Sequence, residues 1–239
     1  PHFFVDEEIE SKEYSLFGED GRHIAKSLRM KEGENLTLCS PSGTVHNCVV
    51  HKVDGDFVEV SILSSEQSRA EPSVKVTLYQ ALPKGDKMEF IIQKAVEIGV
   101  TEIVPVISSR CVSRPDQKSL SKKLLRWQKI AKQAAMQSGR GIVPKVKDAV
   151  PFEKGVENAK GEKVIFYELG GESVKDILSD KQKEISIFIG SEGGFSGDEV
   201  DLVLKNGGRK ATLGKRILRA ETAPLVALTV IMYETNNLE

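Results

Sequence analysis

Two loops of this 239-residue chain combine glycines with charged side chains in a way that suits ligand binding. The first, IGSEGGFSGDEV (189–200), places Glu192 among glycines directly after an apolar run. The second, LGKRILRAETAP (213–224), carries Arg219 and Glu221 and has Pro224 where the first turn of a helix would begin. A carboxylate inside a bare glycine turn suits a ligand with hydroxyl or ammonium groups. We therefore ask first what the glycine loop binds.

A nucleotide phosphate is the usual ligand of a glycine-rich turn between a strand and a helix. The P-loop pattern needs a lysine after its last glycine, but Gly197 is followed by Asp198 and Glu199. The dinucleotide pattern G-x-G-x-x-G is absent as well. Acids in this turn would repel a polyanion. The loop is therefore expected to bind a ligand without phosphate.

Part of this loop has a purely structural interpretation. Ser196 followed by Glu199 predicts a capping box, so Glu199 is expected to cap its own helix. The glycines could simply make a tight connection between strand and helix. That alternative leaves Glu192 unexplained.

The elements around these loops alternate between strand and helix from Val74 onward. A strand at 74–82 precedes a helix at 86–98, for which Asp86 and Glu89 predict a capping box and Gly99 a stop. This alternation predicts an α/β domain with a mostly parallel sheet and helices on both faces. The polar loops, together with YELGGES (167–173), would then meet at the carboxyl edge of the sheet. The other expected strands are 102–107, 163–168, 184–190 and 210–213, and the other expected helices are 119–137, 174–178, 196–205 and 222–234.

The first 63 residues show short strands and turns instead. Strands are expected at 35–40, 45–53 and 57–63, with one short helix at 22–30, which together indicate a small β-barrel. The polar stretch 64–73 is expected to be a linker.

Charge is unevenly distributed, although the net charge is only −1. Eleven lysines and arginines but a single acid, Asp116, lie between Arg110 and Lys147. A basic face suits nucleic-acid binding, and a solvated helix face explains the same pattern. The three cysteines and four histidines show no metal-ligand spacing, so no metal is expected. The acidic first turns and the absence of a long apolar stretch predict a cytoplasmic protein without a membrane span.

Four stretches of the chain resemble the bacterial ribosomal RNA uridine-N3 methyltransferases, the RsmE type of the SPOUT superfamily. They are the two loops above, KGDKMEFIIQKAVEIGV (84–100) and AAMQSGR (134–140), and RHIAKSLRM (22–30) is similar to the family's N-terminal motif. The sequence departs from the family at Ser191, where proline is usual, and at Ala220, where threonine is frequent.

The resemblance implies a PUA-like β-barrel domain at 1–68 and a SPOUT methyltransferase domain at 73–239 with a C-terminal trefoil knot. It also implies S-adenosylmethionine as the cofactor, a homodimer, and 16S ribosomal RNA or the small ribosomal subunit as the partner. The family's target is N3 of uracil 1498. The residues that would contact the cofactor by this resemblance are Leu169, Gly190, Glu192, Gly193, Leu213, Gly214, Ile217 and Leu218.

Methylation at N3 of uracil requires loss of a proton, which a base or a nearby cation can assist. Arg219 is the candidate for electrostatic stabilisation, and Glu221 is the candidate base or the residue that orients Arg219. A salt bridge that only braces the loop is the alternative. N3 lies on the pairing edge, so the uridine must be unpaired when it reacts. The expected RNA contacts are Arg22, Arg29, Lys94, Arg110, Arg126 and Arg140.

Several alternatives remain open from the residues. Trp127 could stack on a base, although a tryptophan on a helix is more often a core residue. Lys94 could form a local ion pair with Glu97. The whole chain could be a noncatalytic RNA-binding or ribosome-assembly factor, or a SPOUT methyltransferase that acts on another RNA.

Overall fold

The computed structural model describes residues 1–179 and 181–238. Its contacts divide the chain into two compact units, one of Pro1–Glu71 with Ala135–Val143 and one of Pro72–Ala134 with Pro144–Glu239. The change from one unit to the other after Glu71 lies within the stretch expected to be a linker. Residues 135–143 are expected in the second domain, and the sequence pattern does not indicate that they belong to the first unit.

The first unit is built on a five-stranded sheet in the order β1-β3-β4-β5-β2. Neighbouring strands are antiparallel except β1 and β3, and no pairing between β1 and β2 closes the barrel among the described residues. The strands are β1 (His2–Phe4), β2 (Glu13–Leu16), β3 (Asn35–Cys39), β4 (Thr44–Asp54) and β5 (Phe57–Gln67).

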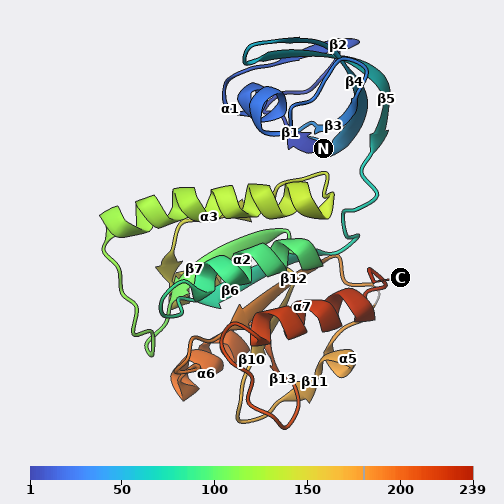
Figure 1. Ribbon diagram of the computed structural model, residues 1–239. Helices are drawn as coiled ribbons and strands as arrows, with labels where there is room; N and C mark the ends of the chain where they lie inside the picture. Colours follow the sequence, from blue (N-terminus) through green and yellow to red (C-terminus); the bar gives the residue numbers. More distant parts are fainter. Residues whose placement is uncertain (180, 239) are drawn as a thin grey trace. The chain divides into compact units, whose positions relative to one another are not determined.

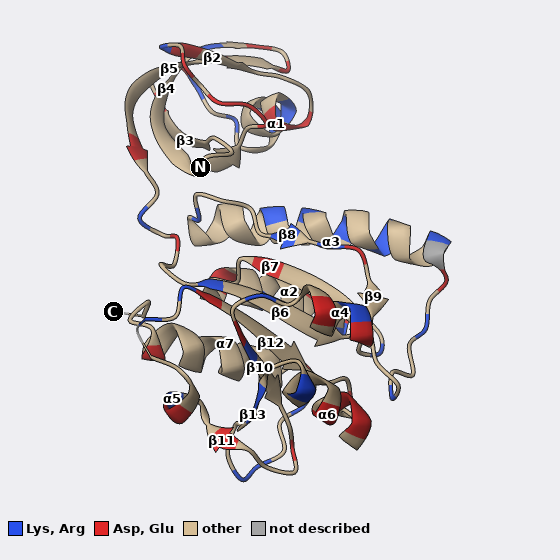
Figure 2. Ribbon diagram, turned by 180° about the vertical axis from the view of Figure 1, so that it is seen from behind, with Lys and Arg blue, Asp and Glu red and all other residues tan. Residues whose placement is uncertain are grey.

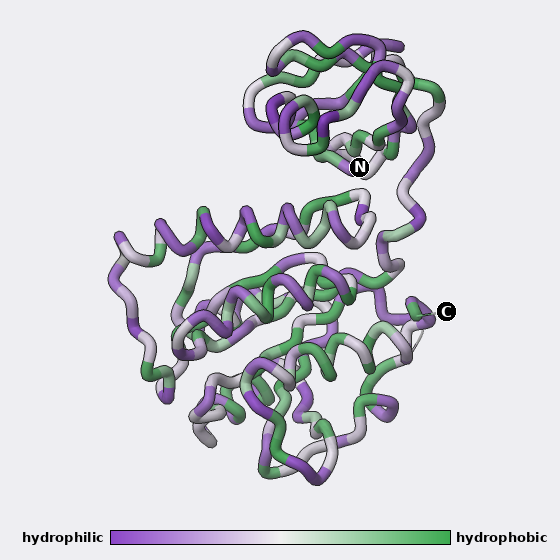
Figure 3. The backbone as a smooth tube through the Cα atoms, in the orientation of Figure 1, coloured by the Kyte–Doolittle hydropathy of each residue, from purple (hydrophilic) through white to green (hydrophobic). Residues whose placement is uncertain are grey.

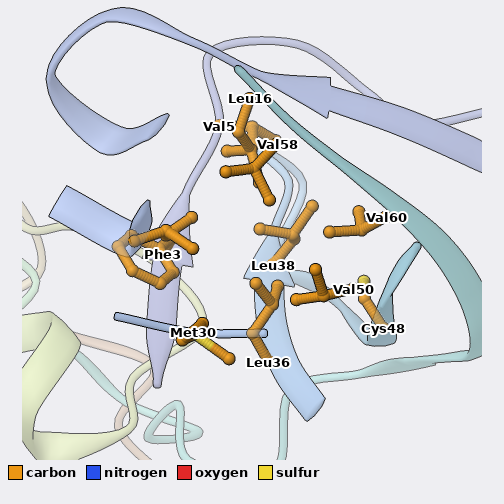
Figure 4. Packing of buried hydrophobic residues seen from close by; sticks show 11 residues of the cluster. Phe3, Val5, Leu16, Met30, Leu36, Leu38, Cys48, Val50, Val58 and Val60 are labelled. Atoms are coloured by element: carbon orange, nitrogen blue, oxygen red, sulfur yellow. The ribbon is translucent and has the colours of Figure 1, made fainter. Parts of the chain in front are cut away.

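Alternating side chains of these strands form the core of the first unit. Figure 4 shows Phe3, Leu38, Val58 and Val60 converging on its centre, with Met30 at one side. Because successive side chains of a strand point to opposite faces, the apolar residues face inward while their neighbours face solvent. This packing confirms the strands expected at 35–40, 45–53 and 57–63.

Two boundaries in this unit differ from expectation. The helix expected at 22–30 is instead α1 (Gly18–Arg22) followed by one π-helical turn (His23–Ser27). It ends early because Arg29 adopts a left-handed backbone with φ of 54°. Strand β5 also continues to Gln67, into the predicted linker, because its polar residues pair with the long strand β4. Local composition could not show that pairing.

The second unit is an eight-stranded sheet in the order β11-β13-β10-β12-β6-β7-β8, with β9 also paired to β7. Every pairing among its described strands is parallel, which confirms the α/β class (Figure 1). The strands are β6 (Lys75–Ala81), β7 (Glu102–Ile107), β8 (Lys145–Val146), β9 (Val150–Pro151), β10 (Glu162–Phe166), β11 (Glu172–Ser173), β12 (Glu184–Ile189) and β13 (Arg209–Thr212).

Helices cover both faces of this sheet. On one face α7 packs against α2, α5 and β6, and on the other α6 packs against α4, β10 and β13. An aromatic cluster lies under α4, in which the Phe188 ring stacks on Tyr79 with centroids 4.7 Å apart. The helices are α2 (Lys87–Ile98), α3 (Gln117–Ser138), α4 (Phe152–Asn158), α5 (Val174–Ile177), α6 (Gly197–Lys205) and α7 (Ala223–Glu234).

The capping predictions have mixed outcomes. The box of Ser196 and Glu199 is present in both directions, and Gly99 ends α2 with a φ of 115°. The box expected at Asp86 and Glu89 is wrong, because Asp86 makes no side-chain cap. The Glu89 carboxylate instead pairs with Arg126 of α3 at 2.7 Å. The carboxylate of Glu89, which the local pattern predicted to cap the helix, therefore binds Arg126 instead.

Helix α3 has one apolar and one polar face, visible as alternating colours along its tube in Figure 3. Trp127 is only 4% exposed, so it is a core residue and not a surface available for stacking. Four basic residues are exposed on this helix at helical spacing, Lys118, Lys122, Arg126 and Lys129, and the other exposed residues described are Ser119, Ser121, Leu125, Gln133 and Gln137.

Candidate functional site

Three loops at the carboxyl edge of the second sheet line one pocket of about 390 Å³. They follow β10, β12 and β13, which are neighbours in the sheet, as the alternation of elements predicts. Of the residues selected from the sequence, those that line the pocket are Gly190, Glu192, Leu213, Gly214, Ile217, Leu218 and Arg219. Leu169, Gly193 and Glu221 are not among the lining residues, although each adjoins one in the chain.

The glycine loop after β12 makes a tight turn closed by its own main chain. The N–H of Gly194 donates to the carbonyl of Ser191 at 3.0 Å, and Gly194 has a φ of 63°. The buried side chain of Gln80 in β6 donates to the carbonyl of Gly190 at 3.3 Å. A side chain at Gly190 would collide with the main chain of Gly194, so glycine at this position allows the two main-chain segments to lie close together.

Glu192 is held by the start of α2. The main-chain N–H of Lys84 donates to both carboxylate oxygens at 3.2 and 3.3 Å, and the Lys87 ammonium lies 2.9 Å from Oε1. Partial burial raises the pKa of Glu192, but the hydrogen bonds from Lys87 and from the backbone outweigh it and leave the pKa below its usual value. Glu192 is therefore an ionised carboxylate in a fixed position, with lone pairs left for a ligand.

Lys87 also contacts the second loop. Its ammonium lies 3.1 Å from Oε2 of Glu221, and Glu221 is 4.0 Å from the guanidinium of Arg219. The pKa of Glu221 lies below its usual value, mainly because its own backbone N–H donates to the carboxylate, with Lys87 adding to the effect. Arg219 is 84% exposed, so its charge is presented to solvent at the pocket wall.

Sequence analysis gave no role to Lys87, which lines the pocket, and it placed Glu168 there only as part of the loop 167–173. One signal for Lys87 was available, since a lysine in the first turn of a helix opposes the helix dipole unless an anion compensates it. The carboxylate of Glu168 lies close to the glycine loop, since a Cβ added to Gly194 would come within 2.6 Å of it.

The predicted RNA contacts are placed on both units. Arg22 pairs with Asp56 at 3.1 Å and Lys94 with Glu97 at 2.9 Å, the latter being the local pair considered as an alternative. Arg29 is exposed, and Arg110 donates to the carbonyl of Gly193 at 3.2 Å. Figure 2 shows blue turns of Lys and Arg along α3, where Arg126 lies.

Arg140 does not suit a phosphate contact. Its side chain is 4% exposed, and its guanidinium is bound by the carboxylate of Glu71. An arginine enclosed in this way braces the first unit, and its burial could not be inferred from a motif alone. We therefore leave Arg140 out of the proposed RNA surface.

The pocket offers groups that fit S-adenosylmethionine. The hydroxyl of Ser191 is buried in the pocket wall without a hydrogen-bond partner in the described chain. The ionised carboxylate of Glu192 lines the pocket, and a carboxylate suits the sulfonium and ammonium groups of that ligand. Apolar side chains of Ile189 and Leu213 line the same pocket and suit an adenine ring.

Within the described residues, no group of three or more His, Cys, Asp or Glu side chains is arranged to hold a metal ion. No described helix combines the length and apolar character needed to cross a membrane.

Comparisons with known proteins agree on one family. Residues 70–232 match a model described as RNA methyltransferase domain, and residues 17–63 match one described as RNA methyltransferase PUA domain. The chain is 37% identical to "Ribosomal RNA small subunit methyltransferase E" of Bacillus subtilis, with 95% of this chain and 92% of that protein covered.

Two solved structures resemble the fold throughout. One is a ribosomal RNA small subunit methyltransferase E from Neisseria gonorrhoeae bound to S-adenosyl methionine, with a TM-score of 0.89 and 33% identity over 98% of this chain and 97% of that one. The other is a methyltransferase from Legionella pneumophila in complex with the same cofactor, with a TM-score of 0.88 and 32% identity over 97% and 96%. The chain belongs to the ribosomal RNA small subunit methyltransferase E family.

Proposed function

We propose that this protein transfers a methyl group from S-adenosylmethionine to N3 of one uridine in the 16S RNA of the small ribosomal subunit. The observation that carries this proposal is a pocket lined by Glu192 and Arg219, from two separate loops, and by Lys87, which also pairs with Glu221. Membership of the family supports the reaction class, and the two relatives solved with the cofactor support the donor. A cytoplasmic location fits this substrate.

The cofactor would lie along the glycine loop and the loop after β13. Gly190, Ser191 and Gly194 offer main-chain groups and one hydroxyl, while Glu192 would compensate the cationic groups of the ligand. When bound, S-adenosylmethionine supplies a methyl group whose bond to sulfur breaks, with the electron pair kept by sulfur, as the bond to N3 forms. The chain's task is to hold N3 and that methyl group in line.

Arg219 would stabilise the charge that develops on the uracil ring when N3 loses its proton. Glu221 is held ionised by its own backbone N–H and by Lys87, with its pKa below the usual value. A general base works best when its pKa lies near the working pH, so this carboxylate suits orientation of Arg219 better than proton abstraction. The proton would then leave to solvent.

Methyl transfer is tested with purified protein, labelled S-adenosylmethionine and small ribosomal subunits from cells that lack the enzyme. The expected product is one methyl group per subunit on N3 of a uridine. Label on a ribose hydroxyl, or on no nucleotide at all, would contradict the proposal.

The RNA would be bound chiefly by the basic stripe of α3, defined by Lys118, Lys122, Arg126 and Lys129. Residues 1–71, in contrast, contain fourteen acids and seven lysines or arginines, so Arg22 and Arg29 act there as local contacts only. We expect RNA affinity to fall steeply with added salt, and Lys122→Ala to reduce the slope by about one. Filter binding over a salt series measures both.

Lys154→Ala is the matched control for this experiment, because Lys154 is an exposed lysine of α4 outside the stripe. An affinity that does not change with salt, or equal slopes for all three proteins, would contradict the basic stripe.

A second copy of the chain is proposed to cover α7. One side of α7 is buried against the sheet, yet its other side carries Leu225, Val226 and Val230, half-buried, and Tyr233, 68% exposed. Apolar residues on both sides of a helix indicate a partner on the second side. Tyr233→Glu is expected to give monomers in sedimentation velocity, whereas Leu204→Glu on α6 is expected to leave dimers. A wild-type monomer at micromolar concentration would contradict this proposal.

The trefoil knot implied by the resemblance also stays a proposal. It is supported by the strand order, since β13 pairs with β10 on the side away from β12 and its following loop reaches the same pocket. A crystal structure in which segment 209–222 never crosses the loop 189–195 would contradict it.

A further inference from the structure

Lys87 is the only described side chain that links the two carboxylates of the site. Its ammonium lies 2.9 Å from Glu192 in the loop after β12 and 3.1 Å from Glu221 in the loop after β13. It reaches them from the first residue of α2, so one cation joins three separate segments of the second unit. The side chain is 35% exposed and lines the pocket.

The position of Lys87 is unfavourable for the helix alone. Cations destabilise the first turn of a helix, where main-chain N–H groups already carry partial positive charge. Two anions at contact distance reverse that balance. Lys87 is unfavourable for the helix by itself, and its ion-pair partners Glu192 and Glu221 belong to the loops of the site. This combination indicates that Lys87 has a role in the site.

Glu221 depends on this ammonium. Its Oε2 atom is buried and accepts no well-aligned hydrogen bond in the described part of the chain, so the contact with Lys87 provides its charge compensation. The other cation facing Glu221 is Arg219, at 4.0 Å and on the same loop. Without Lys87, Glu221 would attract Arg219 toward itself, and Glu192 would face Glu221 as an uncompensated like charge.

We infer that Lys87 is a positioning residue of the methyl-transfer site, which ties Glu192 and Glu221 together and leaves the Arg219 guanidinium directed to the substrate. This inference rests on the proposed function. Lys87 need not touch the cofactor or the uridine to act in this way. Its effect is on the charge and the position of residues that do.

Lys87 also influences how methyl transfer depends on pH. Lys87 favours the ionised forms of Glu192 and Glu221, so its removal is expected to raise the pKa of both carboxylates. Activity requires an ionised Glu221 beside Arg219, and the acid limb of the pH–rate profile follows that ionisation. Lys87→Met is therefore expected to move the acid limb to higher pH. A residue that only stabilised the fold would leave the limb in place.

The experiment compares full-length wild type with Lys87→Met, Lys87→Arg and Lys154→Met. Lys154 is a matched control, because it forms an ion pair of 2.7 Å with Glu157 on α4, away from the pocket. We expect kcat to fall about tenfold or more for Lys87→Met, as loss of alignment does, and to recover largely in Lys87→Arg. Lys154→Met should match the wild type, and thermal melts identify any variant that fails to fold.

A carbon-13 NMR titration of the glutamate carboxyl groups makes the test independent of turnover. If wild type transfers no methyl group, the proposed function fails, and the titration still measures whether Lys87 lowers the pKa of Glu221. If Lys87→Met misfolds, the test uses Lys87→Arg, in which the pKa of Glu221 must stay as low as it is in the wild type. A wild-type kcat, acid limb and Glu221 pKa in Lys87→Met would overturn the inference.

Discussion

Replacing Arg219 with alanine is expected to lower kcat for methyl transfer about a hundredfold or more, as loss of one preorganised charge-stabilising donor does. The side chain is 84% exposed, and its ion-pair partner among the described residues is Glu221 at 4.0 Å, so its loss should hardly affect the fold. Single-turnover transfer to small ribosomal subunits measures the chemical step, and circular dichroism checks the fold.

Arg219→Lys is the informative companion, because it keeps the charge but loses the planar fork of donors. An intermediate rate in this variant would show that charge carries part of the effect. Near-normal turnover in Arg219→Ala would refute the role given to Arg219 and favour the alternative, a salt bridge that only braces the loop.

Gly190→Ala is expected to weaken S-adenosylmethionine binding while the protein still folds. A Cβ at Gly190 would lie 2.9 Å from Cα and 3.1 Å from the carbonyl carbon of Gly194, so the turn would have to open. Overpacking of this kind costs about 1–3 kcal/mol, which corresponds to about a fivefold to hundredfold loss of affinity if the cost arises only in the cofactor-bound state. Isothermal titration calorimetry with the cofactor measures it.

Gly197→Ala is the matched control in the same loop. A Cβ at Gly197, the first residue of α6, meets no atom within 4 Å. The affinity of this variant should equal that of the wild type. Equal affinities for both variants would mean that the tight turn at Gly190 does not shape the cofactor site.

Local patterns in the sequence predicted the parts of this structure that depend on neighbours in the chain. The capping box at Ser196 and the stop at Gly99 were foreseeable because a few adjacent residues determine them. The convergence of the loops was foreseeable because parallel strands share one carboxyl edge. These features are enough to predict that Glu192 and Arg219 lie in one pocket.

Features that depend on distant residues were not predictable in this way. Glu89 pairs with Arg126, 37 residues away, and so makes no capping box. Arg140 is enclosed by Glu71 across 69 residues, so a basic residue in a motif is unavailable to RNA. Lys87 contacts Glu192 and Glu221, which are distant in the sequence, only in the folded structure. Tertiary contacts therefore determine whether a charged residue serves the fold or the functional site.

The central claim is methylation of one uridine at N3, and mass mapping of 16S ribosomal RNA from cells that lack this protein tests it most directly. We predict that the RNA lacks one methyl group, on N3 of a single uridine. The wild-type protein should restore this group, and the Arg219→Ala variant should not. A 16S RNA with all its methyl groups in place, or one that lacks a methyl on another atom, would contradict the account.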